Sequence, residues 1–140
     1  MSETNSATCT IYTDGACSNN QSTNRRAGAG AVLLIETKVA KTAQRLLGNV
    51  TNQVAELEAA ILGLETARAG GHASIILCSD SQYLIKTMKG EFRRKTNLEV
   101  WERVDQAAEG MYVSWNWVRG HSGNKFQEMA DRLAVSAVNS

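Results

Sequence analysis

Residues 8–17 read TCTIYTDGAC, and this stretch decides the fold. Its first side chains alternate, with Cys9, Ile11 and Thr13 on one face, which predicts a β-strand that ends at Thr13. From Asp14 onward the chain is small and polar and is expected to turn away from the strand. Asp14 therefore stands just past a predicted strand end.

A second stretch, SIILCSD at residues 74–80, ends on an acidic residue in the same way. Its short apolar run is typical of a strand that is buried in a sheet. If the two strands are parallel neighbours, Asp14 and Asp80 emerge together at the carboxyl edge of the sheet. Open α/β folds bind their ligands at that edge, so the pair predicts a ligand site.

Three further strands are expected. Residues 28–35 are rich in Val, Leu and Ile, and a probable turn at 36–38 leads into a weakly patterned strand toward residue 47, which together predict a hairpin. Residues 112–118 alternate again, with tryptophans on one side.

Helices are expected where a polar cap precedes apolar residues at helical spacing. Thr51 and Asn52 both suit the cap of one helix, Ser81 and Asn97 cap two others, and residues 126–137 carry a last apolar stripe. The predicted order is βββαβααβα. This order predicts a single α/β domain built on a five-stranded mixed sheet flanked by helices.

Length and composition set the class of protein. The 140 residues suffice for one domain with its own core, which we place at 7–140 behind a polar tail at 1–6. No apolar run approaches the roughly 20 residues that span a bilayer. The first residues lack the basic and apolar regions of a secretion signal, so we expect a cytoplasmic monomer without a membrane partner.

Cysteine, histidine and charge exclude several functions. Cys9, Cys17 and Cys78 form no CxxC pair and are expected to be reduced thiols. His72 and His121 lie too far from one another and from the cysteines for a zinc site. The net charge of +1 does not by itself mark a nucleic-acid binder.

Two more acidic residues lie at informative positions. Glu56 is one step from the apolar Leu57 in a predicted helix, and Asp131 follows the apolar Ala130 in the last one. Each acid alone has an ordinary reading, as a turn residue or as a favourable charge in a first helical turn. Four carboxylates at one edge would repel one another unless a cation neutralised them, and such hard oxygen ligands suit Mg²⁺ or Mn²⁺.

A set of motifs, in order, carries a resemblance to a known family. They are IYTDGAC (11–17), TNQVAEL (51–57), SDSQY (79–83), and GHSG (120–123) followed by ADRLA (130–134). A single one of them would mean little. Because order, spacing and structural context agree from Thr8 to Ala137, the chain resembles type 1 ribonuclease H.

The resemblance implies an endonuclease that cuts the RNA strand of RNA–DNA hybrids. Asp14, Glu56, Asp80 and Asp131 match the four metal-binding carboxylates of the family, which hold two Mg²⁺ ions with substrate, or Mn²⁺ in their place. The implied products have 5′-phosphate and 3′-hydroxyl ends. His121 matches a loop histidine that handles protons or helps product release, although a surface-loop histidine is the ordinary reading.

The resemblance also implies contacts to the hybrid, recognised by its shape and by its 2′-hydroxyl groups. Thr51 and Asn97 match part of a pocket for a DNA phosphate, and both also have the simpler reading of helix caps. The residues that match contacts to sugars and minor-groove edges are Cys17, Asn20, Asn52, Gln53 and Gln82.

Two departures from the family pattern stand out. The basic helix and loop found in many relatives are reduced to a cluster that reads either as a solvated loop or as a phosphate-contacting patch. Its members are Lys86, Lys89, Arg93, Arg94 and Lys95. An arginine of the phosphate pocket is absent, since Asn49 and Val54 occupy the positions nearby.

Two alternatives remain at this point. DNA exonucleases, junction resolvases and transposase cores share this type of fold, but the TNQ helix opening and the GHSG loop argue against them. A hybrid-binding module without catalytic activity would be expected to lose a carboxylate, and all four are present.

Overall fold

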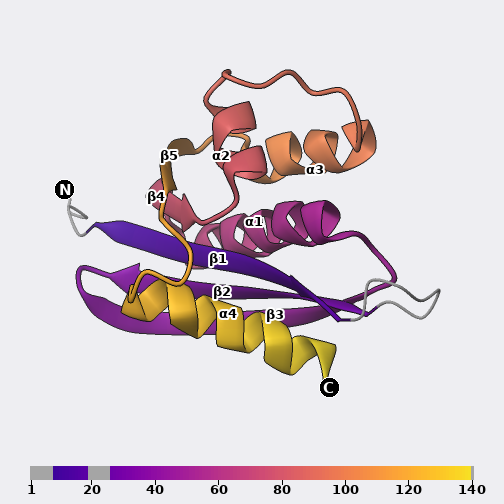
Figure 1. The fold of residues 1–140 in the computed structure, drawn as a ribbon. Coiled ribbons are helices and arrows are strands. Elements are labelled where there is room, and N and C mark those ends of the chain that lie inside the picture. Colours follow the sequence, from indigo (N-terminus) through magenta and orange to yellow (C-terminus); the bar gives the residue numbers. More distant parts are fainter. Residues whose placement is uncertain (1–7, 19–25, 140) are drawn as a thin grey trace.

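The computed structural model describes residues 8–18 and 26–139 and shows three layers (Figure 1). The middle layer is a five-stranded sheet in the order β3-β2-β1-β4-β5. β1, β2 and β3 are antiparallel, whereas β4 and β5 run parallel to β1. The strands are β1 (Cys9–Cys17), β2 (Ala27–Ile35), β3 (Lys38–Gly48), β4 (Ser74–Ser79) and β5 (Tyr112–Trp117).

Helices cover both faces of the sheet. The core on one face includes buried side chains of α1 (Asn52–Ala69), α2 (Gln82–Met88) and α3 (Leu98–Ala108). A smaller apolar cluster on the other face joins α4 (Lys125–Val138) to β1 and β2. The predicted order βββαβααβα and the mixed sheet are confirmed.

β1 is longer than its pattern predicts. The expected end at Thr13 was wrong, because the strand continues to Cys17 and keeps its antiparallel pairing with β2 up to Cys17 and Ala27. Its parallel pairing with β4 does stop at Thr13 and Ser79. Asp14 therefore lies inside β1, yet one residue past the point where β4 ceases to pair with it.

The small residues after Asp14 reflect packing rather than a turn. A Cβ atom added at Gly15 would lie 2.5 Å from the carbonyl carbon of Ala55, so only glycine lets β1 come this close to α1. This close approach brings the Asp14 segment directly against the first turns of α1.

α1 occupies the centre of the larger core. The predicted stripe of Leu57, Ile61 and Leu64 is buried, and so are the alanines between these positions. α1 packs between the sheet and α3, where Trp101 is 1% exposed, which explains why its apolar surface is wider than one stripe. The helix that carries Glu56 is consequently held on two sides.

Two of the three predicted helix caps are confirmed. Thr51 Oγ1 accepts a hydrogen bond from the Val54 N–H at 3.2 Å, and Ser81 Oγ accepts one from the Leu84 N–H at 3.1 Å. Asn97 does occupy the N-cap position of α3, but the predicted side-chain cap is absent. Its backbone is left-handed with φ of 56°, and its side-chain amide donates to Tyr83 Oη at 3.1 Å.

The three cysteines are free thiols, as expected. Cys9 belongs to the core under α1, whereas Cys78 pairs in register with Tyr12 and accepts from Asn116 Nδ2 at 3.5 Å. Among the described residues, no helix is both long and apolar enough to cross a membrane. The predicted tail at 1–6 lies outside the described residues.

Candidate metal centre

Three of the four predicted carboxylates meet at the end of the parallel strands. Asp14, Glu56 and Asp80 each offer one oxygen, and these oxygens lie within 4.8 Å of one another. Asp14 comes from β1, Glu56 from the first turns of α1, and Asp80 follows the last residue of β4. Segments 42 and 24 residues apart along the chain therefore supply one cluster, as the carboxyl edge of a parallel strand pair allows.

The backbone of Gly15 orients two of these carboxylates. Its N–H donates to Glu56 Oε1 at 2.9 Å and lies 3.0 Å from Asp14 Oδ1. This geometry depends on the missing side chain at Gly15, because a Cβ there would collide with the backbone of α1. The glycine thus joins strand and helix at the carboxylates themselves.

Asp80 is fixed through its backbone. Trp117 Nε1 donates to the Asp80 carbonyl at 3.2 Å, and the N–H of Val118 donates to the Ser79 carbonyl at 2.9 Å. The loop after β5 passes close to the Asp80 side chain, because a Cβ atom added at Gly120 would lie 2.8 Å from Asp80 Oδ2. The turn that carries Asp80 is therefore packed directly against the end of β5.

Asp131 lies beside the cluster on α4. It is half-buried, and its side chain lies close enough to that of Asp14 to contribute to the raised pKa of Asp14. It is not one of the three residues whose oxygens lie within 4.8 Å of one another. The structure thus places the fourth predicted carboxylate in contact with Asp14, at the margin of the group.

Burial and mutual repulsion shift the carboxylates toward their protonated forms. Desolvation, and then the charge of Glu56, raise the pKa of Asp14. Desolvation and the charge of Asp80 raise the pKa of Glu56, against the hydrogen bond from Gly15. Burial also raises the pKa of Asp80, although the charge of His121 opposes it. Holding all of these groups ionised in so small a volume is costly without a cation.

The donor set fits a hard divalent cation. The cluster offers only carboxylate oxygens, and the described residues place no cysteine or histidine among its three members. Oxygen ligands of this kind suit Mg²⁺ or Mn²⁺. Asp14, Glu56, Asp80 and the neighbouring Asp131 are therefore the residues that could hold such ions.

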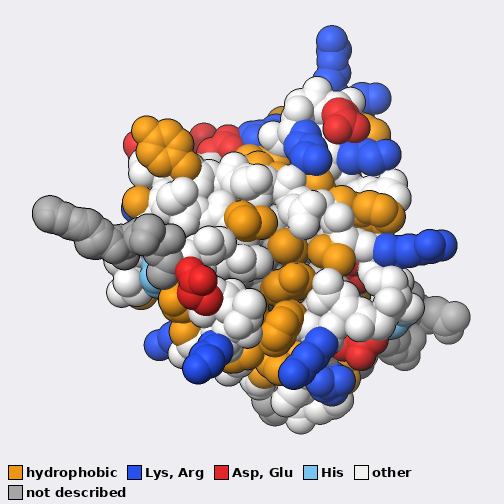
Figure 2. Space-filling view, turned by 90° about the vertical axis from the view of Figure 1, so that its left-hand side faces the viewer, with side chains coloured by type: hydrophobic (Ala, Val, Ile, Leu, Met, Phe, Trp, Pro, Cys, Tyr) orange, Lys and Arg blue, Asp and Glu red, His pale blue; other side chains and the backbone are white. Residues whose placement is uncertain are grey.

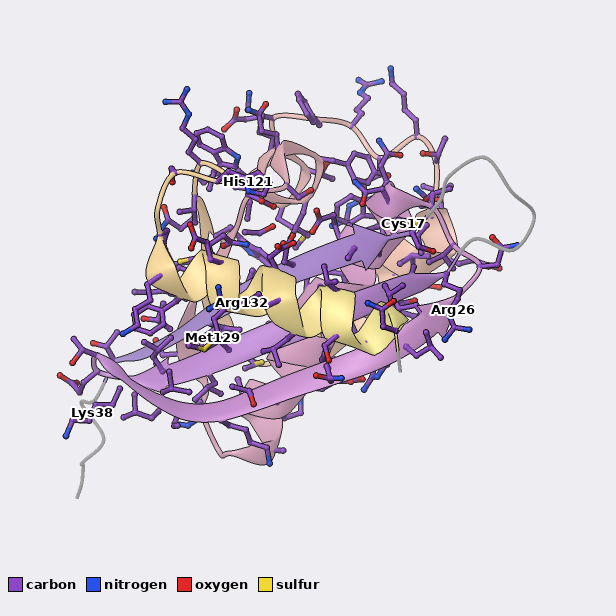
Figure 3. All side chains as sticks on the ribbon, turned by 60° about the horizontal axis from the view of Figure 1, so that its bottom comes forward. Cys17, Arg26, Lys38, His121, Met129 and Arg132 are labelled. Atoms are coloured by element: carbon purple, nitrogen blue, oxygen red, sulfur yellow. The ribbon has the colours of Figure 1, made fainter. Side chains whose placement is uncertain are left out.

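His121 lies in the loop between β5 and α4 (Figure 3). Its backbone is left-handed with φ of 52°, and within the same loop Ser122 Oγ donates to the Arg119 carbonyl at 2.7 Å. The imidazole is exposed but near enough to Asp80 to lower its pKa by charge. The structure thus puts His121 at the rim of the cluster, on the side of Asp80.

The predicted sugar and groove contacts surround this centre unevenly. Asn52 and Gln53 are exposed on the first turn of the helix that carries Glu56, and Gln82 is exposed two residues after Asp80. Cys17, at the end of β1, donates its thiol to the Val50 carbonyl at 3.2 Å. Asn20 lies outside the described residues.

The two predicted phosphate-pocket residues have structural duties as well. Thr51 caps α1, and the Asn97 amide is bound to Tyr83 Oη, which also accepts from Trp101 Nε1 at 3.2 Å. Thr51 is exposed and Asn97 half-buried. These contacts use only part of each side chain, so Thr51 and Asn97 can each form a further hydrogen bond.

The basic cluster divides into bound and exposed members. Arg94 forms two hydrogen bonds with Asp105, at 2.6 and 2.9 Å, and its guanidinium carbon lies 5.0 Å from the Trp101 ring centroid. Lys86 lies 5.5 Å from the centroid of the Phe92 ring. The other three members, Lys89, Arg93 and Lys95, are exposed. The five residues of the cluster therefore differ in how firmly the protein holds their side chains.

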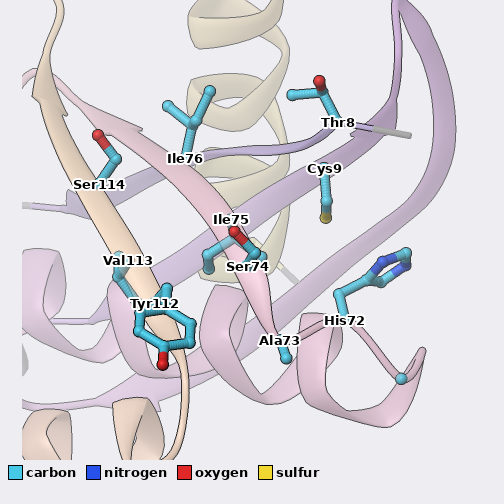
Figure 4. Close-up of a pocket in the computed structure, with 11 residues that line it drawn as sticks. Thr8, Cys9, His72, Ala73, Ser74, Ile75, Ile76, Tyr112, Val113 and Ser114 are labelled. Carbon is cyan, nitrogen blue, oxygen red and sulfur yellow. The ribbon is translucent and has the colours of Figure 1, made fainter. Parts of the chain in front are cut away.

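A cavity of about 770 Å³ lies at the opposite end of the sheet (Figure 4). Its lining includes His72, Ser74 and Tyr112, where β4 and β5 begin, whereas the carboxylates lie where β4 ends. Among the described residues that line this cavity none is acidic, so the cavity is separate from the carboxylate cluster.

Figure 2 shows apolar side chains in the middle of one face of the molecule, with Lys and Arg toward its top and bottom.

Sequence reasoning missed two residues that support the cluster. Trp117 binds the Asp80 carbonyl, and Gln127 on α4 binds the Thr13 carbonyl at 3.0 Å. In both contacts the acceptor is a backbone carbonyl, so the type of the accepting residue gives no indication of the hydrogen bond. The alternation of 112–118 identified the strand but not this use of its last side chain.

Comparisons with known proteins agree with this arrangement. The model of the RNase H family matches residues 6–139. The ribonuclease H of Photorhabdus luminescens is 37% identical over 93% of this chain and 88% of its own length. That of Nitrosococcus oceani is 36% identical over 91% of this chain and 92% of its own.

Solved structures show the same fold. The N-terminal RNase H domain of rv2228c from Mycobacterium tuberculosis superposes with a TM-score of 0.82 and 26% identity, covering 96% of this chain and 95% of that one. LC11-RNase H1, solved in complex with an RNA/DNA hybrid, gives a TM-score of 0.79 at 23% identity, over 94% and 96% of the two chains.

Proposed function

The chain belongs to the ribonuclease H family and is a ribonuclease H, and on this premise we propose that it hydrolyses the RNA strand of RNA–DNA hybrids as an endonuclease. The observation that carries the proposal is the convergence of Asp14, Glu56 and Asp80, whose oxygens lie within 4.8 Å of one another. Such a cluster is unfavourable in water-poor surroundings unless it serves to hold cations.

Two divalent ions, Mg²⁺ or Mn²⁺ in its place, would be held by Asp14, Glu56, Asp80 and Asp131 when substrate is bound. Such ions would supply Lewis-acid chemistry for hydrolysis of the RNA phosphodiester, and the products would carry 5′-phosphate and 3′-hydroxyl ends. The cluster fits this role because it presents oxygen donors from fixed backbone positions.

The chain's own residues orient and complete the site. Gly15 holds the Glu56 carboxylate, and the Trp117 indole holds the backbone of Asp80. His121, at the rim beside Asp80, is assigned proton transfer or release of the cut end, for which an exposed imidazole in a glycine-flanked loop is suited. Its role is accessory, so its loss slows turnover without abolishing it.

Substrate choice is assigned to groups that read sugar hydroxyls and shape. The exposed amides of Asn52, Gln53 and Gln82 can donate and accept without selecting a base, and they lie on the elements that carry Glu56 or follow Asp80. Thr51 and Asn97 are assigned to a DNA phosphate, and Cys17 and Asn20 to the sugar edge. Lys89, Arg93 and Lys95 add a sequence-independent attraction to the backbone.

The decisive experiment compares the wild type with Asp14→Asn on a labelled RNA–DNA hybrid, with Mg²⁺ and with EDTA. We expect cleavage of the RNA strand only by the wild type and only with Mg²⁺. Duplex DNA and duplex RNA, offered in parallel, should stay intact. Cleavage of duplex DNA would favour another nuclease of this fold, and hybrid retention in a gel without cleavage in Mg²⁺ or Mn²⁺ would favour a binding module.

The protein is also proposed to act as a monomer. All three clustered carboxylates come from one chain, so no second copy is needed to complete the site. Sedimentation at micromolar concentration should give a single species of 15.2 kDa.

A further inference from the structure

Gln127 is a buried polar residue on α4, and its side chain contacts β1, the strand that carries Asp14. Its side chain is 3% exposed, and its Nε2 donates to the Thr13 carbonyl at 3.0 Å, across 114 residues of sequence. Asn124 Oδ1 accepts a hydrogen bond from the Gln127 backbone N–H at 3.0 Å, so both the backbone and the side chain of Gln127 are held by hydrogen bonds. Among the described residues Gln127 Oε1 has no partner, which leaves the bond to Thr13 as the polar contact of this amide.

The acceptor of this bond is a special position in β1. Thr13 is the last residue of β1 that pairs with β4, and its side chain is fully buried. A buried carbonyl at the end of a ladder needs a donor from elsewhere. Gln127 supplies it one residue before Asp14.

The same face of α4 carries Asp131. Gln127 and Asp131 are four residues apart, so their side chains lie one above the other on the helix. The amide anchors α4 to β1 at Thr13, and the carboxylate one turn later meets Asp14, the next residue of β1. This hydrogen bond is therefore a polar contact between α4 and β1 next to Asp14 and Asp131, in addition to the apolar packing of α4 on β1 and β2.

We propose that Gln127 is a positioning residue for the metal centre, acting through Thr13 to hold Asp131 against Asp14. This inference rests on the proposed function, because it assigns Asp131 a part in holding the ions. Gln127 is buried and is not one of the residues proposed to hold the ions.

The test variant is Gln127→Met, which keeps the length of the side chain and removes the N–H. The control is Ala134→Gly, a fully buried position of the same helix that lies away from Thr13 and loses stability through helix propensity. Each protein is assayed for kcat and KM on the hybrid, for the Mg²⁺ concentration of half-maximal rate, for Mn²⁺ binding by calorimetry, and for Tm in EDTA.

We expect Gln127→Met to raise the half-maximal Mg²⁺ concentration and to weaken Mn²⁺ binding by about 5- to 10-fold, the value of one hydrogen bond, with KM for hybrid within about twofold. Ala134→Gly should lower Tm with no change in metal dependence. Equal metal dependence in the two variants would overturn the inference.

If Gln127→Met does not fold, Gln127→Ser takes its place, since serine is too short to reach Thr13 but leaves room for water. A metal dependence shifted beyond that of the control supports the inference, and one equal to it overturns it. The calorimetric result remains informative if the wild type fails to cut hybrid, so failure of the inference is distinguishable from failure of the proposed function.

Discussion

The backbone N–H of Gly15 donates to Glu56 Oε1 at 2.9 Å, which joins the strand carrying Asp14 to the helix carrying Glu56 at the carboxylate itself. The same N–H lies 3.0 Å from Asp14 Oδ1, so one donor is shared between two acids. One backbone N–H cannot stabilise both carboxyls in their ionised form. The cluster is therefore organised before a cation arrives, and in the metal-free protein it is a source of instability.

Replacing Asp14 by asparagine should abolish cleavage and make the metal-free protein more stable. The substitution removes a carboxyl whose ionised form is disfavoured by burial and by the charges of Glu56 and Asp80, while the amide keeps the size of the side chain. We expect Tm in EDTA at pH 8 to rise by about 3–8 °C, the shift that roughly 1–2 kcal/mol produces in a domain of this size. Calorimetry measures it, and a lowered Tm would show that the repulsion is not the dominant effect.

The stability of the metal-free wild type should fall relative to Asp14→Asn as the pH rises. The pKa values of Asp14, Glu56 and Asp80 are raised in the folded protein, so the folded state binds more protons than the unfolded state. The stabilisation is complete below pH about 4, where free carboxyls titrate, and is lost as the pH rises through the raised values. Urea unfolding at pH 5, 7 and 9 in EDTA tests this.

Mg²⁺ should oppose that loss. Ions bound only by the folded state stabilise it by mass action, and they bind best when the carboxylates are ionised. Millimolar Mg²⁺ should therefore raise the wild-type free energy of unfolding more at pH 9 than at pH 5 and leave Asp14→Asn nearly unchanged. An equal effect on both proteins would place the ions elsewhere.

Trp117→Phe should reduce turnover while leaving binding of the hybrid intact. The phenyl ring keeps most of the apolar surface but cannot donate to the Asp80 carbonyl, which the indole reaches at 3.2 Å. We expect kcat to fall by about 3- to 10-fold, the value of one hydrogen bond, with KM within about twofold. Tyr112→Phe, at the exposed start of the same strand, serves as the control and should behave as the wild type.

The basic cluster should separate into two kinds of residue. Replacing the exposed Arg93 and Lys95 by alanine is expected to raise KM about 3- to 10-fold at low salt and to flatten its salt dependence. Arg94→Ala loses the pair with Asp105 and the contact with Trp101, so it should lower Tm more than it changes the salt dependence. An unchanged KM and salt slope in the double variant would remove the cluster from substrate binding.

The order of elements and the acidic positions were predictable because each depends on local pattern. The apolar run before Asp80 and the spacing of Leu57, Ile61 and Leu64 mark a strand and a helix without knowledge of their neighbours. The parallel pairing of the two acid-bearing strands then follows from the connection through α1.

What was missed depends on close packing. The end of β1 was misplaced because Gly15 and Ala16 resemble a turn, whereas the chain continues as a strand and Gly15 is small so that α1 can lie against it. Asn97 stands at the N-cap of α3, yet its side-chain amide donates to the Tyr83 hydroxyl and makes no cap bond. In each case the local sequence is compatible with either structure, and contacts with residues distant in the chain determine which one forms.

The carboxylates sit on segments that span nearly the whole chain, with residue 14 on the first strand and residue 131 on the last helix. Neither half of the chain contains all four carboxylates, so folding of one half alone leaves the group incomplete. Nuclease activity is accordingly coupled to the longest-range contacts of the topology, and these close late because chain-closure entropy opposes them. On the proposed function, the group of four carboxylates is therefore complete only once α4 has packed against β1.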